Sequence, residues 1–239
     1  MFQKYCDEIR KLKNFDREDI LNKKFLLCKE NNLEIYYAPH NEVINDKAKV
    51  FIIGITPGWT QTSIAYKTAH DGLINNITIE QIKKECKRKS RFAGSMRNNL
   101  VNMLDELKLN EKLNINSCIE LFEEKDYMLH TTSMIPYPVF INNRNYTGSI
   151  PKIKDNSILY SYVRKYFYEE VKDLSNALFI PLGKAVEEIL KDMIYEKIIR
   201  EEQCLLGFPH PSGANGHRKK QFELCKNDLL DKIEKYKID

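Results

Sequence analysis

The chain has 239 residues, of which 42% are hydrophobic and 30% are charged, and its 38 Lys and Arg residues face 34 Asp and Glu residues. This balance is typical of a folded protein with a sizeable core and excludes an intrinsically disordered chain. A net charge of +4 permits contact with a polyanion but does not argue for it. The first 19 residues are charged throughout, and no apolar run approaches the roughly 18 residues of a membrane helix. We therefore expect a cytoplasmic protein without a signal peptide or a membrane partner.

The six cysteines contain no C-x-x-C pair, and the five histidines are scattered along the chain. Zinc and iron–sulfur sites commonly take two ligands from one tight turn, which this chain does not offer. We expect buried, reduced thiols, no metal and no other cofactor.

The first element expected in chain order is helical. Asp16 is a good N-cap, and helical spacing follows in Ile20, Leu21, Phe25 and Cys28. We therefore expect a helical extension over residues 1–48. The run KVFIIGI, residues 49–55, is almost wholly apolar, as in a strand that is buried on both faces.

Helices and strands then alternate to the end of the chain. Apolar residues at helical spacing predict helices, and short apolar runs predict strands. The expected helices span 77–89, 98–109, 161–174, 184–194 and 219–236, and the expected strands span 126–135, 176–183 and 202–208. No repeat or linker marks a boundary, so we expect a single domain over residues 1–239.

This alternation favours a parallel sheet with helices on both faces. The expected fold class is α/β, a three-layer α/β/α sandwich with a central, mainly parallel four-stranded sheet. Ligands of such sheets bind at the carboxyl ends of the strands. Two segments rich in Pro and Gly follow expected strands, FIIGITPGWTQ at 51–61 and LLGFPHPSGANGHRKKQF at 205–222. Although they lie far apart in the sequence, both can reach one cleft.

Each segment by itself is more typical of an ordinary turn than of a site. Together, and in this order, they resemble the uracil-DNA glycosylase superfamily. Its members have a first motif G-x-[D/N/E]-P-G or G-Q-D-P-Y after the first core strand and a second, H-P-S-x-x-[N/S], after the last. Here the motifs read Gly54-Ile55-Thr56-Pro57-Gly58 and His210-Pro211-Ser212-Gly213-Ala214-Asn215. Weaker matches, RFAGSMRNNLVNMLDEL and ALFIPLGKAVEEIL, lie between them.

The resemblance implies one uracil-DNA glycosylase-like domain that acts on DNA. It implies that His210 donates a hydrogen bond to the base oxygen that gains charge as the glycosidic bond breaks. A histidine that caps the following helix is the structural alternative. It also implies that Phe92 stacks on the base, with Tyr66 and Trp59 as competitors because the spacing to Phe92 is longer than in the family.

The chain departs from the family pattern at two positions. Thr56 stands where the most active members have Asp, and a hydroxyl can orient water but cannot act as a general base near neutral pH. Turnover should then be slow and the mechanism strongly dissociative, unless another carboxylate such as Asp71 serves as the base. His130 stands where the family usually has the Asn that reads uracil, which makes a modified cytosine a serious alternative. A satisfied histidine inside a strand is the structural alternative for His130.

The turns should contact DNA through backbone amides and short polar groups, with cations added for the phosphates. A poor wedge, Ala214, stands where the most active members insert Leu into the stack, so duplex flipping should be weak. The remaining substrate-binding candidates are Gly54, Pro57, Gly58, Ser212 and Asn215, and the phosphate-binding candidates are Gly183, Lys184 and Arg218.

The leading interpretation is a DNA glycosylase that hydrolyses the N-glycosidic bond of uracil or of another damaged or modified pyrimidine, with a monomer favoured. One alternative is a catalytically weak or inactive base-binding module of the same fold. A further alternative is an unrelated nucleotide-binding α/β protein.

Overall fold

The computed structural model describes residues 1–174 and 176–238, which fall into two compact units. Unit 1 comprises residues 1–44, 56–93 and 135–150. Unit 2 comprises residues 45–55, 94–134 and the described residues from 151 onward. The single domain over residues 1–239 stays a prediction.

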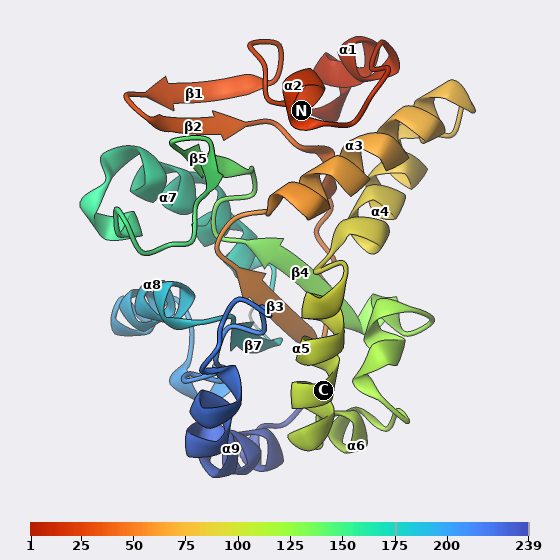
Figure 1. Ribbon diagram of the computed structural model, residues 1–239. Coiled ribbons are helices and arrows are strands. Elements are labelled where there is room, and N and C mark those ends of the chain that lie inside the picture. The colour runs from red at the N-terminus through yellow and green to blue at the C-terminus, as the bar shows by residue number, and fades with distance from the viewer. Residues whose placement is uncertain (175, 239) are drawn as a thin grey trace. The chain divides into compact units, whose positions relative to one another are not determined.

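A parallel sheet of three strands, in the order β4-β3-β7, is the centre of unit 2 (Figure 1). The strands are β3 (Val50–Gly54), β4 (Leu129–Ser133) and β7 (Leu178–Pro181), and every residue in them is buried. A strand buried on both faces needs apolar residues throughout, which is why FIIG is an uninterrupted apolar run. The prediction of an α/β fold with a parallel sheet is confirmed.

Among the described residues, the fourth predicted strand, residues 202–208, pairs through one parallel bridge, between Phe179 and Cys204. The next amide, that of Leu205, still donates to the Phe179 carbonyl at 2.9 Å. The chain then turns, because Leu206 N–H bonds back to the Cys204 carbonyl and Gly207 has a φ of +94°. The central four-stranded sheet is therefore not confirmed, since the chain leaves the edge of β7 directly after its first pairing.

The described part of unit 2 contains five α-helices. Phe167 of one of them, α7, packs on Phe51 of β3 with the ring centres 6.2 Å apart, so α7 covers one face of the sheet. The three-layer arrangement stays a prediction. The predicted helices at 98–109, 161–174, 184–194 and 219–236 are confirmed. The five are α5 (Ser95–Glu106), α6 (Leu109–Leu113), α7 (Ser157–Lys172), α8 (Lys184–Tyr195) and α9 (Arg218–Lys235).

An antiparallel sheet in the order β1-β2-β5-β6 belongs to unit 1. Its first hairpin is formed by residues 26–36, where a helical extension over residues 1–48 was predicted. That prediction is therefore wrong in the second half of the range. Asn31 has a φ of 51°, which suits a tight turn, and Leu33 and Ile35 are buried on either side of Glu34, a period of two that suits a strand. The strands are β1 (Leu26–Glu30), β2 (Leu33–Tyr36), β5 (Val139–Ile141) and β6 (Arg144–Asn145).

The helices of unit 1 include two short ones, α1 (Cys6–Arg10) and α2 (Arg17–Ile20), and a longer packed pair, α3 (Trp59–Ile74) and α4 (Ile79–Ser90). Asp16 caps α2 as predicted, because its carboxylate accepts from Asp19 N–H at 3.0 Å. The helix predicted at 77–89 is confirmed as α4, whereas α3 was not predicted. No helix among residues 1–174 and 176–238 is long and apolar enough to cross a membrane.

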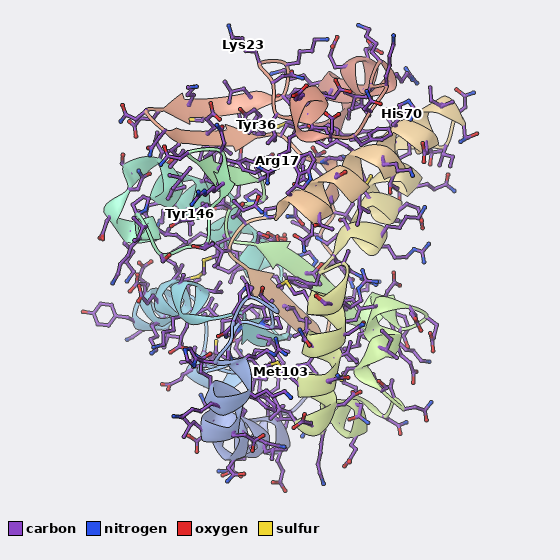
Figure 2. The ribbon with its side chains drawn as sticks, in the orientation of Figure 1. Arg17, Lys23, Tyr36, His70, Met103 and Tyr146 are labelled. Carbon is purple, nitrogen blue, oxygen red and sulfur yellow. The ribbon has the colours of Figure 1, made fainter. Side chains whose placement is uncertain are left out.

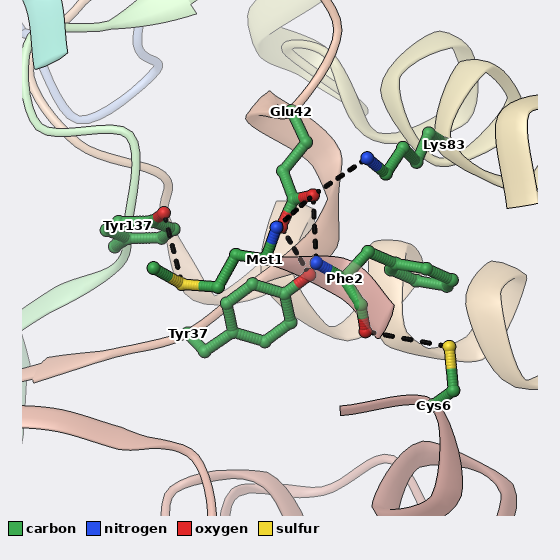
Figure 3. Close-up of polar contacts among 7 residues, drawn as sticks. All are labelled: Met1, Phe2, Cys6, Tyr37, Glu42, Lys83 and Tyr137. Atoms are coloured by element: carbon green, nitrogen blue, oxygen red, sulfur yellow. Dashed lines mark hydrogen bonds and ion pairs between the residues drawn. The ribbon is translucent and has the colours of Figure 1, made fainter. Parts of the chain in front are cut away.

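One carboxylate, that of Glu42, organises the start of unit 1 (Figure 3). It accepts hydrogen bonds from the Tyr37 hydroxyl at 2.7 Å and the Phe2 amide at 2.9 Å. It also pairs with Lys83 of α4 at 3.0 Å and with the Met1 amino group at 3.3 Å. Glu42 therefore joins the first residues, the segment after β2 and helix α4.

Candidate functional site

His210 lies in the loop between Gly207 and α9, and its imidazole is half-buried. Its Nδ1 accepts a hydrogen bond from the Ser212 amide at 3.2 Å. A neutral imidazole whose Nδ1 is an acceptor carries its proton on Nε2. Burial lowers the pKa of His210, so the ring is neutral near pH 7. Within the part of the chain that the structure describes, Nε2 has no hydrogen-bond partner, and it is therefore an available neutral donor.

Gly183 brings the end of β7 against His210. Its φ is +89°, and a Cβ built on it would lie 3.2 Å from Cβ of His210. Its amide also donates to the Phe208 carbonyl at 3.1 Å. Only glycine combines this backbone conformation with so close an approach. The two predicted site residues therefore meet at the carboxyl end of β7, next to the strand that ends at Gly54.

Arg218, predicted to bind a DNA phosphate, also bonds groups inside unit 2. Its guanidinium donates to the carbonyl oxygens of Ser212 at 2.9 Å and Pro211 at 3.3 Å, and to Asn99 Oδ1 at 3.2 Å. Asn215 has a similar use, since its side-chain amide donates to the His210 carbonyl at 3.2 Å. The bonds of Arg218 direct three of the five guanidinium N–H groups at the His210 loop and Asn99, and phosphate binding by Arg218 stays a prediction.

Lys184 keeps its role as a phosphate-binding candidate. It is the first residue of α8, it is exposed, and it has no ion-pair partner among the described residues. Free amides and the helix dipole favour anions at this end of a helix.

The prediction that His130 reads the base is wrong, because the side chain of His130 lies in the core. It is fully buried, and its partner across the sheet is Phe51, at the amino end of β3. Its Nδ1 accepts from the Asn45 amide at 3.3 Å, so Nε2 carries the proton that it donates to Glu170 Oε1 at 2.6 Å. Thr132 donates to the other carboxylate oxygen at 3.0 Å. Both ring nitrogens are engaged, so His130 has no edge with which to read a base.

Ser133 is a further candidate that sequence reasoning missed. It is the last residue of β4, directly opposite Gly54, and its hydroxyl has no hydrogen-bond partner among the described residues. Its side chain and that of His130 point to opposite faces of the sheet, because their positions differ by an odd number. Its place at the carboxyl end of a strand was a usable signal, and the richer chemistry of histidine obscured it.

The first motif is divided between the units: Gly54 belongs to unit 2 and Thr56 to unit 1. The Thr56 hydroxyl donates to the Tyr137 carbonyl at 2.7 Å and accepts from the Val139 amide at 3.1 Å. Its only proton is thus used to hold the segment that leads into β5. One acceptor position remains, so Thr56 can accept from a water but cannot donate to one.

Pro57 and Gly58 form the entry to α3. Gly58 is the N-cap residue of α3, and its amide donates to the Gln61 side chain at 3.3 Å. A Cβ on Gly58 would meet no atom within 4 Å in the described residues, so packing does not require glycine here. The open space beside its backbone is compatible with close approach of a ligand.

The three aromatic candidates belong to unit 1 and differ in accessibility. Tyr66 has no exposed surface and bonds the Tyr37 carbonyl at 2.8 Å, so it is a core residue. Phe92 is 5% exposed and has a left-handed φ of 49°, which is uncommon for a bulky residue. Trp59 is partly exposed, and the guanidinium of Arg17 lies 5.3 Å from its ring centre. Arg17 is labelled in Figure 2.

The family model of the Uracil DNA glycosylase superfamily matches residues 42–234, a span that contains both motifs. A protein of Bacillus subtilis (strain 168), named "Uncharacterized protein YoxB", is 46% identical over 221 residues. The matched region is 92% of this chain and 86% of that protein. No solved structure matches the chain significantly.

Proposed function

Since the chain belongs to the uracil-DNA glycosylase superfamily, we propose that it is a DNA glycosylase that hydrolyses the N-glycosidic bond of uracil, or of another damaged or modified pyrimidine, flipped out of DNA. Membership excludes the unrelated nucleotide-binding protein considered above. It also supports DNA as the partner, since the superfamily acts on DNA.

The observation that carries the proposal is the neutral Nε2–H donor of His210. Breaking the glycosidic bond leaves negative charge on the departing base. A fixed donor aimed at a base oxygen stabilises that charge and costs no reorganisation as the bond breaks, which is commonly worth about 3–4 kcal/mol. Ser212 N–H on Nδ1 and burial both favour the neutral Nε2–H ring that this role needs.

The candidate residues assist the attack of water less than they assist the departure of the base. Thr56, the residue at the position of the usual Asp, can accept one hydrogen bond from a water but cannot take its proton. We therefore propose a dissociative reaction, in which the bond to the base is largely broken before water adds, and a slow turnover. Because His130 is withdrawn, the choice among pyrimidines rests on other residues.

The test uses single-stranded and duplex oligonucleotides that each carry one uracil, thymine, cytosine, 5-methylcytosine or 5-hydroxymethylcytosine. After incubation with the protein, alkali cleaves the strand wherever a base has been removed, and gel electrophoresis measures the product. We expect cleavage at one class of pyrimidine, and we expect His210→Ala to lower the rate about 10²–10³-fold.

The control for this variant is His70→Ala, which removes a histidine of α3 that faces Asp71 at 3.2 Å, and it should keep the parental rate. Circular dichroism must show that both variants are folded. Full activity in His210→Ala would mean that another group stabilises the departing base.

A second function, a base-binding module without turnover, is favoured by the structural use of the Thr56 hydroxyl. This alternative predicts that the protein binds an oligonucleotide with a modified pyrimidine more tightly than its unmodified form and leaves no alkali-labile site in any of them.

A further inference from the structure

Three hydrogen bonds involve the peptide unit that joins Pro211 and Ser212: two end on the Pro211 carbonyl, and one runs from the Ser212 amide to His210. The Pro211 carbonyl accepts from Asn99 Nδ2 at 2.9 Å and from Arg218 Nη1 at 3.3 Å. Arg218 Nη2 in turn donates to Asn99 Oδ1 at 3.2 Å, which closes a triangle between α5, α9 and the loop. Arg218 Nη1 also donates to the Ser212 carbonyl at 2.9 Å. We call Asn99 and Arg218 the loop clamp.

The carbonyl that the clamp holds and the amide that bonds His210 belong to one rigid group. A peptide unit is planar and trans, so the Pro211 C=O and the Ser212 N–H point in opposite directions within one plane. Two donors on the oxygen therefore fix the rotation of that plane. The same rotation aims the Ser212 N–H at Nδ1 of His210.

Arg218 stands at a helix position that is unfavourable for a cation. It is the first residue of α9, where the helix dipole disfavours a cation, and the first turn of α9 contains no acidic residue. Its charge is instead directed at two carbonyl oxygens and an amide oxygen, all of them in or beside the loop. Charge-assisted bonds of this kind are stronger than neutral ones.

We propose that Asn99 and Arg218 are positioning residues for the glycosylase reaction: by holding the Pro211 carbonyl they orient the Ser212 amide onto His210 Nδ1 and so keep the proton of the imidazole on Nε2. This inference rests on the proposed function, and neither residue touches the base. Without the clamp, the peptide plane is free to rotate, and the imidazole loses the bond that selects its tautomer.

The test variant is Asn99→Asp, which is nearly isosteric and keeps the acceptor for Arg218 but loses the donor to the Pro211 carbonyl. Arg218→Met, which removes every donor of the clamp partner, is the second variant. The matched control is Lys226→Ala. Lys226 pairs with Glu106 at 2.8 Å and so joins the same two helices, away from the loop.

Two readouts separate positioning from general loss of structure. The first is the tautomer of His210, measured from its ring nitrogen shifts by two-dimensional NMR with assignment by His210→Gln. We expect the Nε2–H form in the parent and in Lys226→Ala, and a mixture of tautomers in both clamp variants. The second is steady-state kinetics, in which the clamp variants should lose on the order of tenfold in kcat with KM nearly unchanged.

An unchanged His210 tautomer in both folded clamp variants overturns the inference. A changed tautomer supports it, and this measurement does not need a substrate. If the tautomer changes as expected while the parent protein cleaves no oligonucleotide, the positioning role stands and the proposed glycosylase function fails.

Discussion

The Thr56 hydroxyl has one proton, and that proton bonds the carbonyl oxygen of the buried residue Tyr137. The same oxygen accepts from the amide of Val139, which is buried as well. A residue at a motif position therefore also links two backbone groups of unit 1. Substitutions at Thr56 will change stability as well as any chemistry.

Thr56→Val should lower the free energy of unfolding by about 1–3 kcal/mol, because it leaves a part-buried carbonyl and a part-buried amide without these bonds. Thr56→Ser keeps the hydroxyl and should differ little from the parent. Thr56→Asp should also be less stable than the parent, since a carboxylate cannot donate to the Tyr137 carbonyl. Urea unfolding curves check these values. Equal stability of the Val and Ser variants would show that the two bonds contribute nothing.

The substitution His130→Asn should weaken the fold and leave base preference unchanged. It removes a fully buried ring that bonds Asn45 and Glu170, and the cost should be about 2–5 kcal/mol of unfolding free energy. His70→Asn, on the surface of α3, is the control and should cost less than about 1 kcal/mol. A shift of cleavage toward uracil with unchanged stability would restore His130 to the site.

At the scale of elements, helix α8 offers two lysines with different surroundings. Lys184 opens the helix and is unpaired among the described residues, whereas Lys191, almost two turns later, pairs with Glu187. The N-terminus of a helix attracts anions, and the middle of a helix does not. Only Lys184 is therefore placed to add to phosphate binding.

Replacing Lys184 by Ala should weaken DNA binding and reduce the slope of log K against log salt by about one, as expected for one lost phosphate contact. Lys191→Ala should leave the slope unchanged. Fluorescence anisotropy titrations at several salt concentrations measure both. Equal slopes for the parent and Lys184→Ala would remove Lys184 from the DNA interface.

At the scale of the whole molecule, a buried histidine links stability to pH. His40 is 4% exposed, and neither ring nitrogen has a hydrogen-bond partner within residues 1–174 and 176–238. Burial, together with the nearby Lys87 ammonium, lowers the pKa of His40 to about 3. In the unfolded chain its pKa should be about 6.5. Between these two values the unfolded state binds one more proton than the folded state.

The contribution of neutral His40 to the unfolding free energy is fully present above about pH 6.5 and falls as the pH drops toward 3. His40→Phe should therefore reduce the slope of the unfolding free energy against pH between about pH 4 and 6. The reduction should correspond to about one proton fewer taken up on unfolding. Urea titrations at a series of pH values measure the slope. A slope equal to that of the parent would mean that His40 is already protonated in the folded protein.

Much of the architecture follows from local sequence. The apolar runs around Phe51 and Phe179 became adjacent parallel strands, and α4, α5, α7, α8 and α9 form where apolar residues recur at helical spacing. These signals are local because a buried strand or an amphipathic helix needs a particular residue type at each turn of its own backbone. The same holds for the motif pair, whose order along the chain identifies the family. The β1–β2 hairpin was missed although its turn at Asn31 is local too, because the helical spacing before it was extended too far.

The use of individual polar side chains was decided by tertiary structure alone. His130 meets Glu170, 40 residues later, and Arg218 meets Asn99, 119 residues earlier. A sequence pattern specifies which groups can donate or accept, but a hydrogen bond also needs a partner within about 3 Å in the right direction. Folding satisfied both nitrogens of His130 and left Nε2 of His210 available. That difference in satisfied partners, which no spacing along the chain encodes, separates a core histidine from a candidate catalytic one.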